Sequence, residues 1–540
     1  MTFTPTAEQL GIIDSSASAV VIAGPGRGKT ATAIAAADTW AIAHPSRRVL
    51  FTSYSNTAVR RIAEAGGMRT QHGSLDFRTF HSVAFEVLAD YGRFVGLQRP
   101  AQVLDKPAEH LVALEQAWPD DSAEYAAARL AHAQRTGLVA FADMIPLASA
   151  LLDTSSTLCR AIQRRYGCLV VDEFQDTTAE QTAFLHQLSG DGRLLAFGDP
   201  HQMIYEHDFE NAQTRFTSTA EWKSVDLTTF HGRNYRCAAT DILDFAEAVL
   251  HGQKFTEGSA NVCCAGMYAN QRRSYIAIRC QSIWKKSPGT SIGIIVPNSK
   301  TERELAADLR SPKKGVKGAI PVHAVIEVDP GWADAFRMAT FAASDYAREP
   351  SVDRRRRLAV TLTALERESR RGTPPGLARL GDIEKLLSSS SKRKSALRDF
   401  LAASPLEDVT EFAAGFAASL SADKTFDAVG HTIEKTGIPA IRPIANTEQF
   451  DTFRATRTPA GLHGAECWRA RTTMLSMYRA KGREFDHVIV VTDPRGHKKD
   501  AALGEIRRLH YVACTRARKS LTVLWNSSGI GDVLGPVLHG

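Results

Sequence analysis

A glycine-rich loop between an apolar run and a helical pattern is the feature that most constrains this fold. SAVVIAG (18–24) reads as a buried strand, GPGRGKT (24–30) follows it, and the Ala-rich stretch after Lys29 is helical in pattern. The glycines let backbone N–H groups turn inward around a polyphosphate, and the following helix places its positive end there. Lys29 would reach the β- and γ-phosphates, and the Thr30 hydroxyl would ligate Mg²⁺. The flanking strand and helix favour this site over a glycine turn without function.

Two adjacent carboxylates follow another apolar run, CLVVDEFQD (168–176). Asp172 would hold Mg²⁺, and Glu173, which points the other way, would activate the attacking water. Adjacent carboxylates on a surface strand are usually only solvated. Their place at the end of a hydrophobic run, in a chain that carries the glycine-rich loop, favours the catalytic interpretation.

Strand patterns alternate with helical ones at both ends of the chain, which predicts an α/β fold with parallel sheets. Further strand-like runs are RRVLFTSYS (47–55), RLLAFGD (193–199), TSIGIIVPN (290–298), FDHVIVVTD (485–493) and KSLTVLW (519–525). Residues 91–165 and about 300–450 are mainly helical in pattern. The sequence therefore predicts two α/β cores, one on each side of a helical middle insertion.

Composition adds weaker constraints. A chain of 540 residues is too long for one core and suggests roughly three or four domain-sized units. The net charge of +7 permits nucleic-acid binding without arguing strongly for it. The arginine run DRRRRLAV (353–360) could grip phosphates, although a solvated face is the favoured interpretation. The eight cysteines show no CxxC pair, and we expect reduced thiols. No signal peptide or membrane-spanning run is visible, so we expect a cytoplasmic protein without membrane contact.

Ordered blocks along most of the chain resemble those of the UvrD/Rep/PcrA-like superfamily 1A DNA helicases. The block VVDEFQDTTAEQ is the most specific of these, because it is close to the family's VDEFQDTN letter for letter. The other blocks are FTPTAEQ (3–9), AGPGRGKT (23–30), LFTSYSNTAVRRI (50–62), FRTFHSVAF (77–85), GDPHQ (198–202), NYRC (234–237), MLSMYRAKGREFDHVIV (474–490) and RRLHYVACTRARKSLTV (507–523).

The resemblance implies ATP and Mg²⁺ as cofactors and assigns residues to them. It implies that Gln9 contacts the edge of the adenine, that Tyr235 stacks on the adenine ring and that Glu484 contacts the ribose. The full nucleotide set is Gln9, Ala23, Gly24, Pro25, Gly26, Arg27, Gly28, Lys29, Thr30, Ala31, Tyr235 and Glu484, with Thr30 and Asp172 on the metal. The catalytic set is Lys29, Glu173, Gln202, Arg236 and Arg516. Planar guanidinium groups suit the last two positions because they neutralise charge that builds on phosphate oxygens.

The resemblance also implies an architecture of two RecA-like P-loop NTPase domains that sandwich ATP, with reduced, mainly helical insertions. The first domain would comprise residues 1–90 and 166–230, and the second residues 231–300 and 450–540. The helical insertion would span 91–165, and the accessory insertion 301–449. The cleft between the two domains would close on ATP and reopen after hydrolysis. This cycle would move the DNA-binding surfaces of the two domains relative to each other, and in family members it gives 3′–5′ stepping.

Single-stranded DNA would lie across both domains, held by aromatic stacking and phosphate contacts. By position in the family blocks, the candidates are Tyr54, Asn56, Phe80, His81 and Tyr205. An aromatic residue near a strand end is as often part of the core as a stacking platform.

Four departures from the family pattern bear on function. An acidic run, Glu206-His207-Asp208, follows Tyr205 where the family has an aromatic residue and an arginine, and Tyr478-Arg479 replaces His-Ser before AKG. Arg27 replaces a small residue in the phosphate loop, and both helical insertions are short.

Two functions follow from the resemblance. The favoured one is an ATP-dependent DNA translocase and helicase on single-stranded or tailed DNA, in DNA repair or in defence against foreign DNA. The alternative is a DNA-sensing ATPase or regulatory subunit, similar to the helicase of Gabija-type anti-phage systems, beside a partner nuclease.

Overall fold

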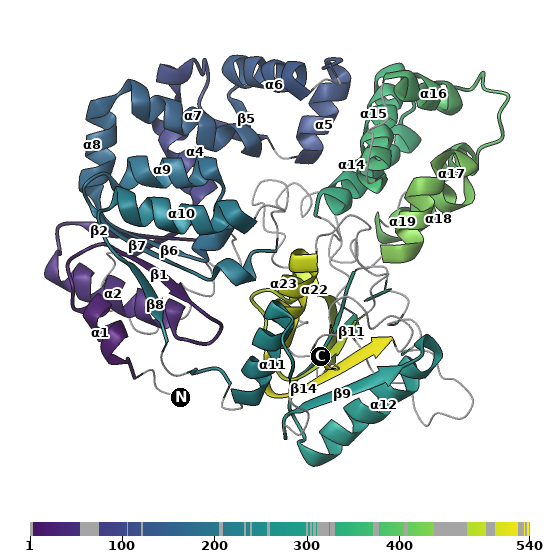
Figure 1. The fold of residues 1–540 in the computed structure, drawn as a ribbon. Helices are drawn as coiled ribbons and strands as arrows, with labels where there is room; N and C mark the ends of the chain where they lie inside the picture. The colour runs from purple at the N-terminus through teal and green to yellow at the C-terminus, as the bar shows by residue number, and fades with distance from the viewer. Residues whose placement is uncertain are drawn as a thin grey trace. The chain divides into compact units, whose positions relative to one another are not determined.

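The chain folds into two units, each assembled from segments that are far apart in the sequence. The first unit holds Met1–Tyr91, Met144–Val325 and Ala470–Gly540, and the second holds Gly92–Asp143 and Ile326–Arg469. Figure 1 shows the protein as a computed structural model. The structure describes residues 4–53, 75–104, 106–119, 122–204, 209–231, 234–237, 240–255, 260–298, 301–302, 305, 309, 323–324, 330–370, 377–403, 409–436, 472–492, 503–526, 534 and 537–538.

Two six-stranded sheets form the framework of the first unit, and each described strand pair in them is parallel. The first sheet has the order β3-β2-β6-β7-β1-β8, and the second has the order β11-β12-β10-β13-β14-β9. The predicted α/β fold with parallel sheets is therefore confirmed. The strands of the first sheet are β1 (Ala19–Ala23), β2 (Arg48–Ser53), β3 (Leu75–Thr79), β6 (Tyr166–Asp172), β7 (Arg193–Gly198) and β8 (Leu227–Phe230). Those of the second are β9 (Val262–Met267), β10 (Ile292–Val296), β11 (His323–Ala324), β12 (Thr472–Ser476), β13 (Phe485–Val491) and β14 (Ala517–Asn526).

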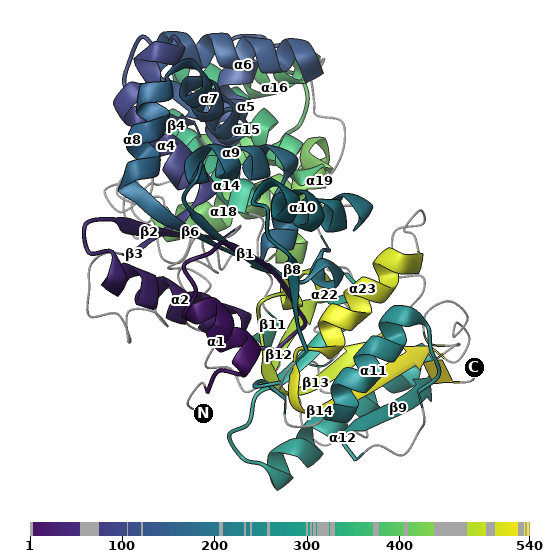
Figure 2. The ribbon, with the colours of Figure 1, turned by 60° about the vertical axis from the view of Figure 1, so that its left-hand side comes forward.

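Helices cover both faces of each sheet, as parallel sheets require. On the first sheet, α1 and α2 lie on one face and α9 and α10 on the other (Figures 1 and 2). On the second, α11 and α23 share one apolar core with the sheet, and α12 shares the opposite core. The helices are α1 (Ala7–Ile13), α2 (Lys29–Ala43), α4 (Phe80–Tyr91), α7 (Phe141–Thr154), α8 (Ser156–Arg165), α9 (Ala179–Ser189), α10 (Phe209–Trp222), α11 (Thr240–His251), α12 (Ala269–Lys286), α22 (Met477–Ala480) and α23 (Leu503–Cys514), with 3₁₀ turns η2 (Phe174–Asp176) and η3 (Pro200–Gln202).

Strand register brings the polar motifs of the first sheet to one edge. Val171 pairs with Ala196 between β6 and β7, and Ile22 pairs with Gly198 between β1 and β7. The glycine-rich loop, the Asp172-Glu173 pair and the GDPHQ segment all begin where these neighbouring strands end. Because the carboxyl ends of parallel strands meet at one edge of the sheet, segments far apart in sequence become neighbours.

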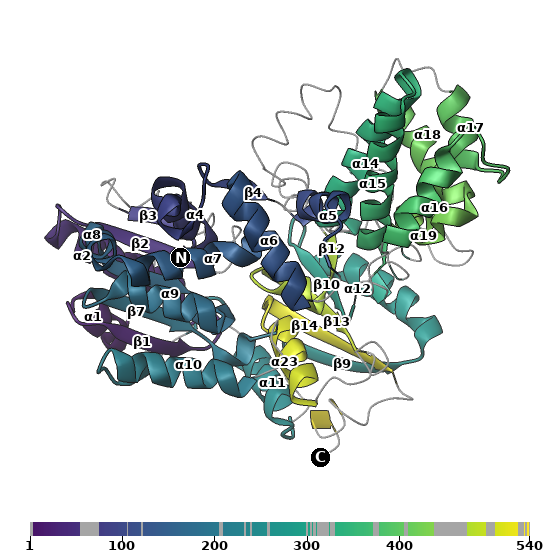
Figure 3. The ribbon, with the colours of Figure 1, turned by 90° about the horizontal axis from the view of Figure 1, so that it is seen from above.

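The second unit is mainly helical. Its helices α14 to α19 pack around one core (Figure 3), which Leu114 of α5 also joins. The helices are α5 (Lys106–Glu115), α6 (Ser122–Thr136), α14 (Pro330–Arg348), α15 (Val352–Ser369), α16 (Leu377–Leu387), α17 (Ala396–Ala403), α18 (Val409–Ala422) and α19 (Asp427–Thr436), with 3₁₀ turns η1 (Gly92–Val95) and η4 (Lys424–Phe426). A small parallel pair, β4 (Gln102–Leu104) and β5 (Leu138–Ala140), completes it.

Four details differ from the sequence-based expectations or extend them. β11 belongs to the second sheet although it lies within the range 301–449 that we assigned to the accessory insertion, and β4 and β5 interrupt the helical range 91–165. The cysteines in the described part of the chain are all free thiols. Within that part, none of the helices has both the length and the apolar character needed to cross a membrane.

Candidate active site

The glycine-rich loop joins β1 to α2 through two residues with left-handed backbone geometry. Gly26 has φ 71° and Gly28 has φ 78°, a region that side chains disfavour. A Cβ atom on Gly26 would lie 2.4 Å from Oδ1 of Asn234 and 2.7 Å from Cβ of Arg236. The backbone N–H of Tyr235 donates to the Gly26 carbonyl oxygen at 2.8 Å. The loop is therefore packed directly against the NYR segment that follows the first sheet.

Lys29 is the first residue of α2, and its ammonium folds back over the loop. Its Nζ donates to the carbonyl oxygens of Ala23 at 2.7 Å and Gly24 at 3.2 Å, and the residue is 9% exposed. Burial lowers the pKa of the Lys29 ammonium, and the carboxylates of Asp199, Glu173 and Asp172 act against that shift. A cation held out of water at this place suits the phosphate oxygens of a nucleotide.

The two predicted carboxylates lie beside the loop. Oγ1 of Thr30 donates to Oδ2 of Asp172 at 2.6 Å, so both predicted metal ligands are in contact. Burial, reinforced by the neighbouring Glu173 charge, raises the pKa of Asp172 to about 6. A divalent cation would relieve this cost, because it favours the ionised carboxylate.

Glu173 diverges from Asp172 because its backbone is left-handed, with φ 56°. Such a conformation is strained for a non-glycine residue and is often found at functional sites. Burial acts to raise the pKa of Glu173, but the positive charges of Lys481 and Lys29 outweigh it, and the pKa is lowered. Glu173 is therefore held as a carboxylate, the form that can accept a proton.

Gln202 lies in η3 and links the two sheets. Its Nε2 donates to Oδ2 of Asp199 at 2.8 Å, and its Oε1 accepts from Nη2 of Arg516 at 3.1 Å. Arg516 comes directly before β14 and is 2% exposed. Burial, reinforced by the charge of Arg236, lowers the pKa of Arg516 to about 10. Arg516, a predicted catalytic residue of the second sheet, thus reaches Gln202, a predicted catalytic residue of the first.

The second predicted arginine is held by the carboxylate that the resemblance assigns to the ribose. Nε of Arg236 lies 2.6 Å from Oε1 of Glu484, and Nη2 of Arg518 lies 2.7 Å from Oε2 of the same carboxylate. Burial acts to raise the pKa of Glu484, but Arg236 and Arg518 outweigh it and lower the pKa. Among the described residues, no hydrogen-bond partner faces Nη1 of Arg236, although this atom is buried.

The predicted adenine side is built at the start of α1. Gln9 caps the helix together with Thr6, and its Nε2 donates to the Arg27 carbonyl oxygen at 2.9 Å. The Tyr235 hydroxyl donates to Oε1 of Gln9 at 3.2 Å and to the Thr4 carbonyl oxygen at 2.6 Å. The guanidinium of Arg27 donates to the Phe230 carbonyl oxygen at 3.2 Å, at the end of β8. Gln9, Arg27 and Tyr235 are therefore brought together.

Lys481 is a residue of this site that the sequence analysis did not single out. Its Nζ lies 2.5 Å from Oδ1 of Asp176 and donates to the Gln202 carbonyl oxygen at 2.7 Å. Both side chains of this ion pair are buried. Lys481 stands in the AKG block and Asp176 ends the DEFQD block, so the two motifs were visible, but nothing in either predicts that they pair.

The predicted DNA-binding residues are described only in part. Tyr54, Asn56 and Tyr205 lie outside the described residues, as does the acidic run Glu206-His207-Asp208. His81 is partly exposed at the start of α4, whereas Phe80 is 2% exposed. A ring buried to that extent has no open face for a base, which counts against the stacking role predicted for Phe80.

Tyr478 and Arg479, which replace the His-Ser of the family pattern, each contact a glutamate. The Tyr478 hydroxyl donates to Oε1 of Glu505 at 3.4 Å, and Nη1 of Arg479 lies 3.4 Å from Oε2 of the buried Glu302. Both contacts fix the segment that leads into Lys481.

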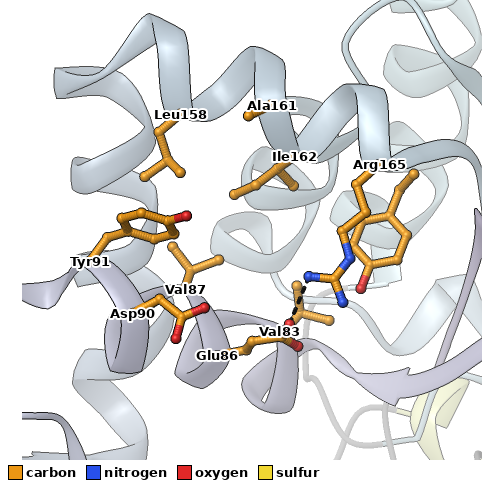
Figure 4. Close-up of a pocket in the computed structure, with 10 residues that line it drawn as sticks. Val83, Glu86, Val87, Asp90, Tyr91, Leu158, Ala161, Ile162 and Arg165 are labelled. Atoms are coloured by element: carbon orange, nitrogen blue, oxygen red, sulfur yellow. Dashed lines mark hydrogen bonds and ion pairs between the residues drawn. The ribbon is translucent and has the colours of Figure 1, made fainter.

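A separate pocket of about 170 Å³ lies between α4 and α8 (Figure 4). Val83, Val87, Leu158 and Ile162 line it, and Nη1 of Arg165 meets Oε1 of Glu86 at its rim at 2.8 Å. It shares no residue with the site around Lys29.

Two regions of the chain, one toward each end, match known protein families. Residues 9–208 match a family described as an AAA domain, and residues 462–528 match the UvrD-like helicase C-terminal domain. These ranges contain the glycine-rich loop, the carboxylate pair, Lys481 and Arg516. At both ends the chain is therefore similar to the UvrD/Rep/PcrA-like superfamily 1 helicases.

Individual UvrD/Rep/PcrA-like relatives match over part of their length. The ATP-dependent DNA helicase PcrA of Leuconostoc citreum is 24% identical over 282 residues, which cover 43% of this chain and 37% of PcrA. DNA helicase II of Escherichia coli strain K12 is 25% identical over 278 residues, 43% of this chain and 38% of the relative. An ATP-dependent helicase/nuclease subunit of Exiguobacterium sibiricum is 32% identical over 133 residues, which cover 22% of this chain and 11% of that relative. The matched stretch thus spans less than two fifths of each.

The site is suited to the ATP and Mg²⁺ that UvrD-like helicases use. Gly26 leaves no room for a side chain, Lys29 is buried with its charge uncompensated by an ion pair within the described residues, and Nη1 of Arg236 is buried without a partner among those residues. Thr30 and Asp172 offer oxygen ligands at one place, as Mg²⁺ prefers. These residues fit a nucleotide polyphosphate and its cation.

Proposed function

We propose that this protein is an ATP-dependent DNA translocase and helicase that moves 3′–5′ on single-stranded DNA, in DNA repair or in defence against foreign DNA. Single-stranded or tailed DNA is its proposed substrate, and ATP with Mg²⁺ its energy source. The proposal rests on the similarity to UvrD-like helicases and on the arrangement of charged residues at the edge of the first sheet.

The strongest support for this proposal is the hydrogen bond that Arg516 of the second sheet donates to Gln202 of the first. A hydrogen bond of 3.1 Å joins the side chain before β14 to the turn after β7. Hydrolysis at such a site depends on groups from both sheets, so that nucleotide turnover and relative movement of the sheets are linked. That linkage is what a translocase requires.

The environment of each side chain supports a proposed chemical role. Lys29 and the loop amides would bind the polyphosphate, and Thr30 and Asp172 would ligate Mg²⁺, which would neutralise charge on the phosphate oxygens. Glu173 is the proposed base for the attacking water. Arg236 and Arg516 would stabilise the charge that develops during phosphoryl transfer.

The proposed nucleotide-binding set is that of the sequence analysis, with Gln9 and Tyr235 at the adenine and Glu484 at the ribose. We retain the proposed domain boundaries, 1–90 with 166–230 and 231–300 with 450–540. Proposed DNA contacts are Tyr54, Asn56, His81 and Tyr205, with Phe80 disfavoured by its burial.

ATP hydrolysis measured with single-stranded, duplex and 3′-tailed DNA, beside unwinding of the same substrates, tests the proposal. We expect hydrolysis that single-stranded and tailed DNA stimulate, and unwinding of the tailed duplex. Wild-type protein without ATPase activity on any nucleic acid would overturn it.

A second candidate function is a DNA-sensing ATPase or regulatory component that works beside a nuclease in anti-phage defence. The short helical segments and the similarity to a helicase/nuclease subunit favour it. DNA-stimulated hydrolysis without strand displacement by the purified chain, together with co-purification of a nuclease from the source cells, would favour this function over the first.

A further inference from the structure

A continuous series of hydrogen bonds connects the proposed base to the proposed arginine of the other sheet. Nε2 of Gln175 donates to Oε2 of Glu173 at 2.6 Å, and Oε1 of Gln175 accepts from the Asp199 backbone N–H at 2.9 Å. Asp199 then accepts from Gln202, which accepts from Arg516. The first link in this series is the side chain of Gln175, to which no role in the chemistry has been assigned.

The orientation of the Gln175 amide follows from its neighbours. A backbone N–H can only donate, so the group that faces Asp199 N is the amide oxygen. The amide nitrogen must then face Glu173, whose carboxylate can only accept. Gln175 is 0% exposed, so water has no access to replace either bond.

The packing around Gly198 is independent evidence that the Gln175 amide occupies a defined position. A Cβ atom on Gly198 would lie 2.5 Å from Oε1 of Gln175 and 2.6 Å from the Phe216 ring. The glycine that ends β7 is therefore required by close packing of the Gln175 side chain, not by its backbone angles. The DEFQD and GDPHQ segments are joined at this contact.

We propose that Gln175 is a positioning residue that fixes the Glu173 carboxylate relative to Gln202 and Arg516, so that the base and the charge-stabilising groups act as one unit. This inference rests on the proposed function, because it concerns the same hydrolysis. Glutamine is suited to the position since it carries a donor and an acceptor on one planar group. Glutamate would keep an acceptor for Asp199 but would set a second carboxylate against Glu173.

The test compares Gln175→Leu and Gln175→Glu with wild type in the full-length protein. Gln181→Leu is the matched control, because Gln181 is also a buried glutamine, six positions along in the same block, and within the described part of the chain its side chain serves to cap α9 by accepting from the Thr178 backbone N–H. Four quantities are measured: kcat and KM of DNA-stimulated ATP hydrolysis, the dissociation constant for a fluorescent ATP analogue, and hydrogen exchange at the Asp199 amide.

We expect both Gln175 variants to lower kcat about 10- to 100-fold, as misplaced catalytic groups do, while KM and nucleotide affinity change less than about twofold. Exchange at the Asp199 amide should become faster, and Gln181→Leu should leave all four quantities near wild type. Combining Gln175→Leu with Arg516→Ala should lower kcat by less than the product of the single effects, because both act through one connected series.

Wild-type kcat in Gln175→Leu, or a fall in kcat matched by an equal loss of nucleotide affinity, would overturn the positioning role. If wild-type protein itself shows no hydrolysis with any DNA, the proposed function fails, and unchanged exchange at the Asp199 amide in Gln175→Leu would then reject the contact independently.

Discussion

Lys481 and Asp176 form a buried ion pair between segments 305 positions apart, with 2.5 Å between Nζ and Oδ1. Their side chains are 7% and 4% exposed. Since Lys481 also donates to the Gln202 carbonyl oxygen, it connects the segment before β13 to both polar turns of the first sheet.

Lys481→Met should therefore destabilise the first unit and impair hydrolysis. Removing one partner of a buried pair leaves the other charge uncompensated and typically costs about 3–5 kcal/mol. Urea unfolding gives the free energy of unfolding. The control is Lys519→Met, which removes an exposed pair with Asp486 and should cost about 1 kcal/mol or less. Equal effects of the two substitutions would contradict the burial argument.

Lys29→Ala should abolish nucleotide binding and reduce DNA-stimulated ATP hydrolysis by about 100-fold or more, because one preorganised cation at the phosphates is lost. Binding of a fluorescent ATP analogue and steady-state hydrolysis check this. Lys285→Ala on the exposed face of α12 is the matched control and should behave as wild type. If Lys29→Ala hydrolysed ATP at the wild-type rate, the proposed role of Lys29 in binding the phosphates would be wrong.

Glu366→Ala should destabilise the helical second unit. Glu366 is fully buried, and its carboxylate meets Nε of Arg379 at 2.7 Å and Nη2 of Arg370 at 2.7 Å. Its removal leaves Arg379 without its carboxylate, at a cost of about 3–5 kcal/mol. Limited proteolysis and urea unfolding measure the loss. Glu384→Ala, which removes a surface pair with Arg356, should change stability by about 1 kcal/mol or less, and a larger change there would count against this ranking.

His186 should make the first sheet's helical layer sensitive to acid. Its ring stacks on Trp222 with centroids 3.9 Å apart, and burial, reinforced by Lys223, lowers its pKa to about 4. Between pH 6.5 and 4 the unfolded chain binds a proton that the folded protein excludes, so stability falls as pH falls through that window. Above about pH 6.5 the imidazole is neutral in both states and contributes no pH dependence.

His186→Gln should reduce the loss of stability between about pH 7 and pH 5 by about 1 kcal/mol, after allowance for solvent screening of a partly exposed ring. Urea unfolding at both pH values measures this difference. The exposed His231 serves as control for the substitution itself, since surface substitutions usually change the free energy of unfolding by about 0.5 kcal/mol or less. An unchanged pH dependence in His186→Gln would contradict the prediction.

Local patterns in the sequence were sufficient for the α/β class and for the placement of several residues of the proposed nucleotide site. The apolar runs before Gly24, Asp172 and Gly198 are long enough to be buried strands, and parallel strands place whatever follows them at one edge. The grouping of Lys29, Thr30 and Asp172 at this edge was therefore predictable, because the chemistry of each segment and its place at a strand end are local properties, whereas the choice of Gln202 came from the family resemblance. β3, β8, β9 and β12 were less visible, because their runs are short or lie inside motifs that also carry chemistry.

Pairings between distant segments were decided by the tertiary structure alone. The Lys481–Asp176 ion pair, the placement of Gln175 between Glu173 and Asp199, and the burial of Phe80 depend on strand order and register, which no local pattern specifies. Considered in its own segment, neither Lys481 nor Gln175 shows which group it contacts in the folded protein. The role of Lys481 or Gln175 is set when folding excludes water from the side chain and brings a group of opposite charge or matching hydrogen-bond polarity into contact with it. The chemical groups at the strand ends can therefore be identified from the sequence, whereas strand order and register set which of those groups are in contact.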